Sequence, residues 1–265
     1  MAWLRHYLLA LQFFTRVPVT GRVAAWVGYS PAMLRASAAH FPGIGWIVGL
    51  LAAAVAGGLL VVLPPSPFAP LLAAVLSTIA TVLFTGALHE DGLADVADGL
   101  GGSAQRERAL EIMKDSRIGA FGALALVLAL LAKVSLLALL GSIDVRVLCA
   151  SLLLAHVLSR TWPLLLIRLL PYVGDAAGSK SKPMADAISA GGLAAGFAWA
   201  LAAAALVACV QGAAFLLAPV AASVIALAIM ARWFLRRLQG FTGDCLGAAQ
   251  QVCEIACYLG VALAL

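Results

Sequence analysis

Acidic residues gather in one polar stretch between two apolar segments. Seven of the twelve acidic residues lie there, and the densest part, residues 89–102, reads HEDGLADVADGLGG. If this stretch is helical, Asp91, Asp95 and Asp98 follow i, i+4, i+7 spacing and share one face. Carboxylates this close repel one another unless a positive charge lies among them. Magnesium takes such oxygen ligands, usually together with substrate phosphates, so we predict that these three aspartates hold magnesium.

A solvated loop is the ordinary explanation for a run of charges. Two features favour a ligand site instead. The spacing is helical and one-sided, and glycines are interleaved with the acids, at positions 92, 99, 101 and 102. Glycine permits close approach of the backbone to a ligand, or the left-handed turn that ends a helix.

A second polar group occupies residues 113–119, just before an apolar segment. Lys114 and Arg117 can neutralise phosphate oxygens, and an arginine can do so through two parallel hydrogen bonds. We therefore assign Lys114, Asp115, Ser116 and Arg117 to substrate binding. Ordinary positive charge flanking a membrane helix remains the alternative.

A glycine-rich turn, residues 240–247, carries a single acid and enters the last apolar segment. Asp244 would complete a metal site, bind a ribose hydroxyl or cap the helix, and these alternatives stay open. We place Asp244 with the three aspartates in the predicted catalytic set, and Gly243 in the substrate-binding set. The polar loop 178–182 is a weaker candidate for contact with phosphate.

Three basic residues fall inside apolar segments, where charges are costly and often functional. Arg168 lies near one end and can extend to the membrane surface. Arg160 is deeper, so we expect it to face a substrate cavity and include it in the substrate-binding set. Lys133 has no obvious partner, and we expect no acid deep within a span.

The composition indicates an integral membrane protein. Hydrophobic residues make up 64% of the 265 residues and charged residues 11%, whereas soluble domains are about half apolar and a quarter charged. The net charge of +5 comes from scattered basic residues. No dense basic run is present that would follow a phosphate backbone, so we predict no nucleic-acid partner.

Seven segments are long and apolar enough to span a bilayer, which requires about 20 residues. They are residues 43–63, 69–88, 119–140, 147–170, 192–211, 213–231 and 247–265. Residues 1–20 resemble an amphipathic helix lying on the membrane. We therefore predict one all-α membrane domain, residues 1–265, whose small-residue faces would also permit a homo-oligomer.

The loops alternate in charge. Residues 1–42, 89–118, 171–191 and 232–246 contain most of the lysines and arginines, whereas the links near 64–68, 141–146 and 212 contain only Arg146. The positive-inside rule places the basic set in the cytoplasm. Segment 89–118 is then a cytoplasmic active-site segment, and the C-terminus lies outside.

Five motifs together resemble the adenosylcobinamide-GDP ribazoletransferases, also called cobalamin synthases. They are LALQFFTRVPV (9–19), HEDGLADVADGLGG (89–102), MKDSRIGAFG (113–122), SRTWP (159–163) and GFTGDCLGA (240–248). The motifs run from the N-terminus to the last apolar segment, so the resemblance covers nearly the whole chain. The set and its order are specific, although the D-G-x-x-D core alone is not.

The resemblance implies a multi-pass enzyme of the bacterial inner membrane. Such an enzyme joins adenosylcobinamide-GDP to alpha-ribazole or its 5′-phosphate, giving adenosylcobalamin or its phosphate and GMP, with magnesium. We expect Asp91, Asp95, Asp98 and Glu90 to hold magnesium on the pyrophosphate, and Lys114 and Arg117 to stabilise the leaving GMP. One of the aspartates, or Asp244, would accept the proton of the attacking hydroxyl.

Two rival interpretations deserve comparison. CDP-alcohol phosphotransferases also use clustered aspartates and magnesium, but their pattern is D-G-x-x-A-R. Here Asp91-Gly92 is followed by Leu93-Ala94-Asp95, without that arginine. A transporter would place ion-binding acids near the midplane and show repeated halves, and no internal repeat is visible.

Overall fold

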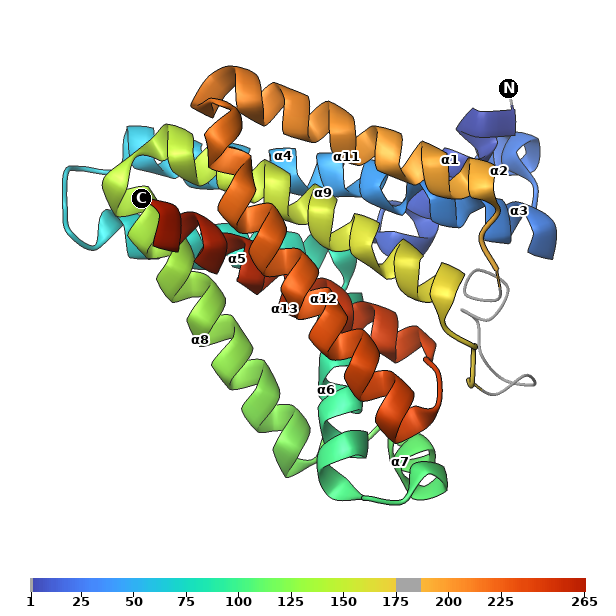
Figure 1. The fold of residues 1–265 in the computed structure, drawn as a ribbon. Coiled ribbons are helices and arrows are strands. Elements are labelled where there is room, and N and C mark those ends of the chain that lie inside the picture. The colour runs from blue at the N-terminus through green and yellow to red at the C-terminus, as the bar shows by residue number, and fades with distance from the viewer. Residues whose placement is uncertain (1, 175–186) are drawn as a thin grey trace.

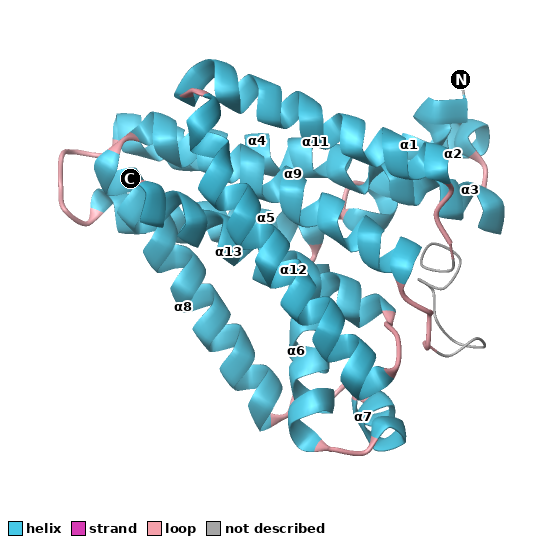
Figure 2. Cartoon of the chain, in the orientation of Figure 1, coloured by secondary structure: helices cyan, strands magenta, loops and turns pink. Residues whose placement is uncertain are grey.

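The computed structural model describes residues 2–174 and 187–265, and these residues are almost entirely helical (Figures 1 and 2). No strand occurs among them; one isolated bridge joins Tyr172 to Phe241. The all-α prediction is therefore confirmed. The predicted phosphate contact in loop 178–182 lies outside the described residues.

Six helices of the described chain are long and apolar enough to cross a membrane. They are α4 (Phe41–Val62), α8 (Ala120–Ile143), α9 (Val145–Leu169), α11 (Ala190–Gln211), α12 (Leu217–Leu238) and α13 (Gly243–Ala264). The shorter α5 (Ala69–Thr85) supplies the seventh predicted span. All seven predicted segments are thus helices.

Helix α12 differs from its predicted bounds at both ends. A 3-10 turn, η2 (Ala213–Leu216), precedes α12, and α12 continues to Leu238 rather than stopping near 231. Arg236 and Arg237 lie in the last turn of α12, where positive charge favours the helix terminus. Arg237 Nη2 also donates to the carbonyl oxygens of Leu100 and Ser103, at 3.1 and 2.6 Å. The hydropathy of the sequence falls near residue 231, but the helix continues to Leu238, where Arg237 makes these contacts.

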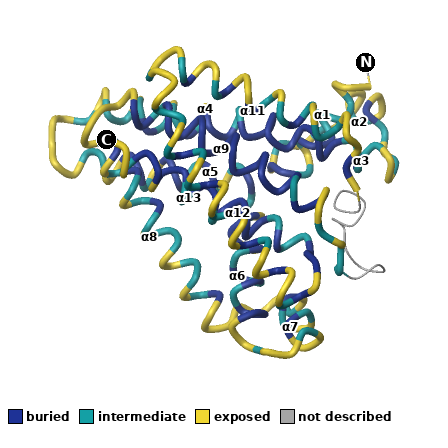
Figure 3. Tube along the Cα trace, viewed as in Figure 1, coloured by how far each residue is buried: buried dark blue, intermediate teal, exposed yellow. Residues whose placement is uncertain are grey.

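Helix α9 is the centre of the bundle. Buried residues make up 89% of its most apolar part, against 17% for α8 at the edge (Figure 3). Glycines let α4 lie directly against it, since a Cβ on Gly45 would come within 2.9 Å of Val157 Cα, and one on Gly49 within 2.9 Å of Leu153 Cα. The G-x-x-x-G pair therefore serves packing within the chain, as small residues do in membrane bundles.

The chain before α4 is more structured than a loop. It forms α1 (Ala2–Phe14), α2 (Gly21–Val27), α3 (Pro31–Ser37) and the 3-10 turn η1 (Ala38–His40). Helix α1 ends six residues before the predicted boundary at 20, and its Leu9, Ala10 and Phe14 are buried. Its apolar stripe therefore packs at least partly on the protein.

The acidic segment becomes helix α6 (Leu88–Gly102), bent by 90° from α5. The bend consists of two residues with left-handed backbone, Gly86 at φ 69° and Ala87 at φ 58°. A positive φ is ordinary for glycine but rare for alanine. Because α6 runs across the direction of α4 and α9 (Figure 1), we treat it as lying outside the spans.

A short helix, α7 (Arg106–Ile112), follows α6 at the same end of the bundle (Figure 1). The start of α8, the end of α12 and the start of α13 meet there too. The C-terminus and the links between α4 and α5, and between α8 and α9, lie at the opposite end. This arrangement brings three of the predicted basic segments, residues 1–42, 89–118 and 232–246, to one side of the bundle.

Candidate active site

The acids of α6 point to different partners, although the predicted helical spacing is correct. Asp91 is exposed and Asp95 is half-buried, whereas Glu90 and Asp98 are buried. Charge crowding is centred on Asp95. Partial burial, and then the charges of Asp244, Asp91 and Asp98, raise the pKa of Asp95 to about 7.

Asp98 caps the following membrane helix. Its two carboxylate oxygens accept hydrogen bonds from the backbone N–H groups of Gly119 and Gly122, at 2.7 and 2.8 Å. These N–H groups belong to the start of α8, where intrahelical acceptors are missing. This role was not anticipated, and it directs Asp98 away from the magnesium set in which we had placed it.

Glu90 also faces inward. Its Oε1 accepts a hydrogen bond of 3.0 Å from Gln251 Nε2 on α13, and the side chain is buried. A carboxylate held in this way supports the contact between α6 and α13. We therefore separate Glu90 from the predicted magnesium ligands.

Asp244 comes to the same place from the other end of the chain. Thr242, not Asp244, is the N-cap of α13, and its Oγ1 accepts from the backbone N–H of Cys245 at 3.4 Å. Thr242 also donates to Asp244 Oδ2, at 3.3 Å. The capping alternative for Asp244 is therefore wrong, and its side chain is available to line a cavity.

Helices α6 and α13 cross at two glycines. A Cβ built on Gly92 would lie 2.8 Å from the carbonyl oxygen of Asp244, and one on Gly247 would lie 3.3 Å from His89 Cα. Only glycine allows this approach without displacement. The crossing sets the separation of Asp91 and Asp95 from Asp244.

We expect Gly92→Ala to lower turnover by about a hundredfold, the usual effect of displacing catalytic groups by about 1 Å. The protein should still be found in membranes, although overpacking costs roughly 1–3 kcal/mol. Steady-state kinetics and a thermal melt check both expectations. Gly58→Ala is the matched control, because no atom lies within 4 Å of a Cβ there. If Gly92→Ala turned over at the wild-type rate, the crossing of α6 and α13 would not control the spacing of Asp91 and Asp95 from Asp244.

A cavity of about 120 Å³ lies where these elements meet. Asp91, His89, Gly243 and Asp244 line it, so the predicted Gly243 and two of the predicted acids share one site. The rest of the wall is mostly apolar: Phe13, Phe14, Phe41, Leu164 and Ile167 among others. The N-terminal motif and the SRTWP region therefore contribute to the same cavity as the acids.

The basic segment of the prediction does not line this cavity. Arg117 is exposed, and its guanidinium bonds Asp115, with Nε 2.9 Å from Oδ1. Those hydrogen bonds lower the pKa of Asp115 to about 2. The segment that holds Lys114 and Ser116 is tied to Asp98 of α6 through Gly119, so it lies beside α6.

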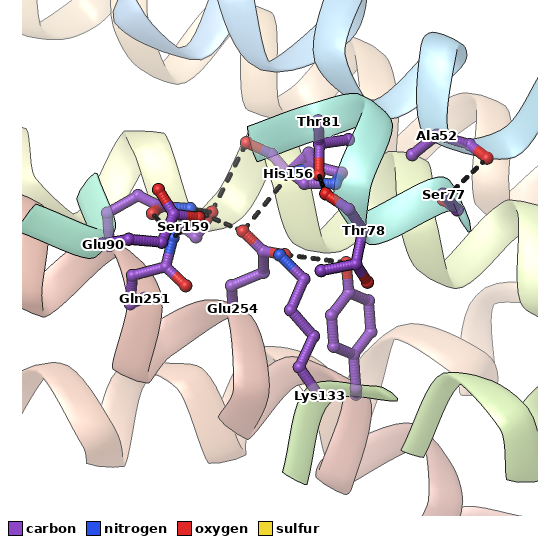
Figure 4. Close-up of polar contacts among 12 residues, drawn as sticks. Ala52, Ser77, Thr78, Thr81, Glu90, Lys133, His156, Ser159, Gln251 and Glu254 are labelled. Atoms are coloured by element: carbon purple, nitrogen blue, oxygen red, sulfur yellow. Dashed lines mark hydrogen bonds and ion pairs between the residues drawn. The ribbon is translucent and has the colours of Figure 1, made fainter. Parts of the chain in front are cut away.

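A buried polar network extends inward from α6, and the sequence analysis missed it. Lys133 Nζ lies 2.6 Å from Glu254 Oε1, and both side chains are buried. Tyr258 and Gln250 also donate to Glu254, at 3.1 and 2.6 Å. Gln250 accepts from Gln251. Gln251 in turn donates to Glu90 (Figure 4).

The network corrects two statements about the membrane interior. Lys133 does have a partner, and one acid, Glu254, does lie deep within a span. A signal was present in the sequence, because Glu254 is the sole acid between residues 247 and 265. Charges inside a membrane pair with one another, so Lys133 and Glu254 were candidates for a pair.

Arg160 reaches the network through His156, whose Nδ1 lies 3.3 Å from Glu254 Oε2, and it lies one layer behind the cavity. Its Nη1 donates to the carbonyl oxygen of His156 at 3.1 Å, and the side chain is buried. Its guanidinium carbon lies 5.8 Å from the ring centre of Phe41, which itself lines the cavity. Arg160 therefore packs against Phe41, which lines the cavity, but Arg160 itself does not line it.

Fold and site together define a class: a multi-pass helical membrane protein with carboxylates from two helices at one cavity. The profile of the family described as cobalamin-5-phosphate synthase matches residues 6–262. The chain is 64% identical to the adenosylcobinamide-GDP ribazoletransferase of Albidiferax ferrireducens, with 99% of each chain covered. It is 61% identical to that of Polaromonas naphthalenivorans (100% of each covered) and 43% identical to that of Vibrio cholerae (96% and 91% covered).

The chain therefore belongs to the cobalamin-5-phosphate synthase family. No solved structure matches it. The resemblance inferred from the five motifs is confirmed, and neither the CDP-alcohol phosphotransferases nor transporters are favoured.

Proposed function

We propose that this protein is a magnesium-dependent adenosylcobinamide-GDP ribazoletransferase. It transfers the cobinamide phosphate of adenosylcobinamide-GDP to a hydroxyl of alpha-ribazole or of its 5′-phosphate. The new bond joins the hydroxyl oxygen to phosphorus, the phosphoanhydride bond breaks, and GMP leaves. The observation that carries the proposal is the meeting of Asp91 on α6 and Asp244 on α13 at one cavity, in a chain matched over its full length to enzymes of that name.

The described residues contain no group of three or more His, Cys, Asp or Glu side chains that could hold a metal by themselves. Magnesium does not require one, because it is usually held by one or two carboxylates plus substrate phosphates. Asp91 and Asp244, with Asp95 beside them, provide such oxygen donors. Bound there, the ion would neutralise charge on the phosphoanhydride.

This assignment revises the ligand set to Asp91, Asp95 and Asp244. Asp98 and Glu90 become positioning residues, the first for α8 and the second for α13, because their oxygens hold those helices. An unligated carboxylate of the revised set accepts the proton of the attacking hydroxyl. Arg117 is exposed, so its guanidinium can release Asp115 and bind phosphate oxygens instead. Lys114 and Arg117 then stabilise the phosphate of the leaving GMP.

We propose the bacterial inner membrane as the location, with the acidic end of the bundle in the cytoplasm. The loops at that end contain nearly all the basic residues outside the spans, as the positive-inside rule requires for cytoplasmic loops. A reporter fused at Leu265 should then be active outside the cytoplasm. Reporter activity confined to the cytoplasm would refute this orientation.

The test of function is release of GMP by protein purified into nanodiscs. With adenosylcobinamide-GDP, alpha-ribazole and magnesium, we expect GMP and a cobalamin product in equal amounts. Excess EDTA should abolish both, and added magnesium should restore them. Turnover that persists in EDTA would refute the magnesium dependence. If folded protein formed no product, the transferase activity itself would be refuted.

A further inference from the structure

Among the described residues, a single side-chain hydrogen bond joins α6 to α13, and Gln251 donates it. Gln251 Nε2 lies 3.0 Å from Glu90 Oε1, and both side chains are buried. The glycine crossing limits how closely the two helices approach, but van der Waals contact does not stop them from separating or turning. A hydrogen bond opposes both movements because it depends on distance and on angle. Gln251 therefore restrains what the glycines leave free.

The orientation of the Gln251 carboxamide is set from the interior of the bundle. Gln250 Nε2 donates to Glu254 Oε2 at 2.6 Å and to Ser159 Oγ at 3.0 Å. The oxygen of Gln250 is then left to accept from Gln251 Nε2, at 2.9 Å. The second hydrogen of Gln251 Nε2 goes to Glu90 (Figure 4). Turning either carboxamide over would set oxygen against oxygen, so the direction of each bond is fixed.

The far end of this chain of bonds is attached to helices that do not take part in the crossing. Lys133 on α8 contacts Glu254, and Ser159 on α9 contacts Gln250. Helix α9 is the most buried of the long helices. The carboxamide of Gln251 is therefore held relative to the core of the bundle, and it holds Glu90 in turn.

The bond lies near both acids of the cavity along the chain. Glu90 directly precedes Asp91, and Gln251 follows Asp244 by seven residues, about two helical turns. The glycine crossing lies between them on α13, at Gly247. Two helices held at one point can pivot, whereas a second point of attachment fixes the angle between them.

We infer that Gln251 is a positioning residue of the active site. It holds α6 at the angle to α13 that keeps Asp91 and Asp244 at the same cavity. Gln251 itself is not among the residues that line that cavity. The catalytic consequence of this inference rests on the proposed function, whereas the attachment of α6 does not.

Gln251→Met keeps the length of the side chain and removes both donated hydrogen bonds. We expect kcat to fall by about tenfold to a hundredfold, the effect of misplacing catalytic groups by up to about 1 Å. The KM for each substrate should stay within about threefold, because the variant alters catalytic geometry and no substrate contact. Gln211→Met is the matched control, since it makes the same change at the last residue of α11. A wild-type kcat in folded Gln251→Met would overturn the inference.

Glu90 provides the conservative variant. The side-chain oxygen in Glu90→Gln still accepts from Gln251, so kcat should stay within about threefold of the wild type. Glu90→Met removes the acceptor and should lose as much activity as Gln251→Met. The double variant should be no worse than either single variant, because both changes remove the same bond. Equal losses in Glu90→Gln and Glu90→Met, as expected of a magnesium ligand, would overturn the inference.

Hydrogen exchange in nanodiscs tests the attachment without substrate or metal. Gln251→Met should raise exchange of the α6 amides, residues 88–102, by about tenfold, whereas the amides of α4 and α9 should keep their wild-type rates. Glu90→Gln should leave α6 at its wild-type rate. Faster exchange in all helices would indicate general destabilisation and would overturn the inference, as would unchanged exchange in α6.

The inference and the proposed function fail in different ways. Wild-type protein that releases no GMP, but whose α6 exchanges faster in Gln251→Met, would refute the activity and keep the attachment of α6. Active wild-type protein with unchanged kcat and exchange in Gln251→Met would keep the activity and refute the positioning role. If Gln251→Met does not fold, the comparison of Glu90→Gln with Glu90→Met still decides the question.

Discussion

Asp95→Asn is expected to lower kcat by about a thousandfold or more while leaving the protein folded in membranes. Asp95 lies among Asp91, Asp98 and Asp244, and partial burial together with their charges raises its pKa to about 7. In the proposed function these carboxylates would hold magnesium, which would neutralise charge on the phosphoanhydride. Metal stabilisation of that charge is worth several kcal/mol, and each 1.36 kcal/mol is a tenfold change in rate.

The same substitution separates catalysis from folding. Removing one of several crowded carboxylates relieves repulsion, so the thermal midpoint in detergent should be equal to or above that of the wild type. Glu107→Gln is the control, since Glu107 is a largely exposed acid of α7 that pairs with Arg106. Activity of Asp95→Asn within tenfold of the wild type would remove Asp95 from the active site.

Lys133→Met is expected to destabilise the protein by about 3 kcal/mol. The substitution leaves Glu254 as a buried carboxylate without its closest cation, and breaking a buried pair costs roughly 3–5 kcal/mol. The low end applies because His156, 3.3 Å from Glu254, remains in place. At about 2–4 °C per kcal/mol, the thermal midpoint should fall by roughly 6–12 °C.

A double-mutant cycle tests whether the two charges act as a pair. Glu254→Gln in the Lys133→Met background removes the uncompensated charge, so the double variant should be more stable than Lys133→Met alone. Melting the four proteins in the same detergent gives the coupling energy. Strictly additive losses would show that the Lys133–Glu254 contact contributes no specific stabilisation.

The sequence predicted the architecture well because hydropathy is a local property. A span of about 20 apolar residues has few alternatives to a membrane helix, and all seven predicted segments are helices. Errors occurred where hydropathy stops being informative. The end of α12 depends on the contacts of Arg237 with Leu100 and Ser103, which lie more than 130 residues away in the chain.

The candidate site was predicted in part. Helical spacing correctly placed Asp91, Asp95 and Asp98 on one helix, but spacing does not say what each side chain faces. Asp98 meets the first N–H groups of α8, and Glu90 meets Gln251. Both contacts arise from helix packing, so no local pattern distinguishes these acids from Asp91 and Asp95.

By itself, the sequence determined a helical membrane protein with one acidic segment and the family to which it belongs. The tertiary structure alone decided that Asp244 joins Asp91, that Phe14 and Phe41 form the cavity wall, and that Lys133 pairs with Glu254. The physical reason is that the apolar composition of a long segment is enough to make it a helix in lipid. Which side chains meet depends on glycine contacts such as Gly92 against α13, and these bring together residues far apart in the chain.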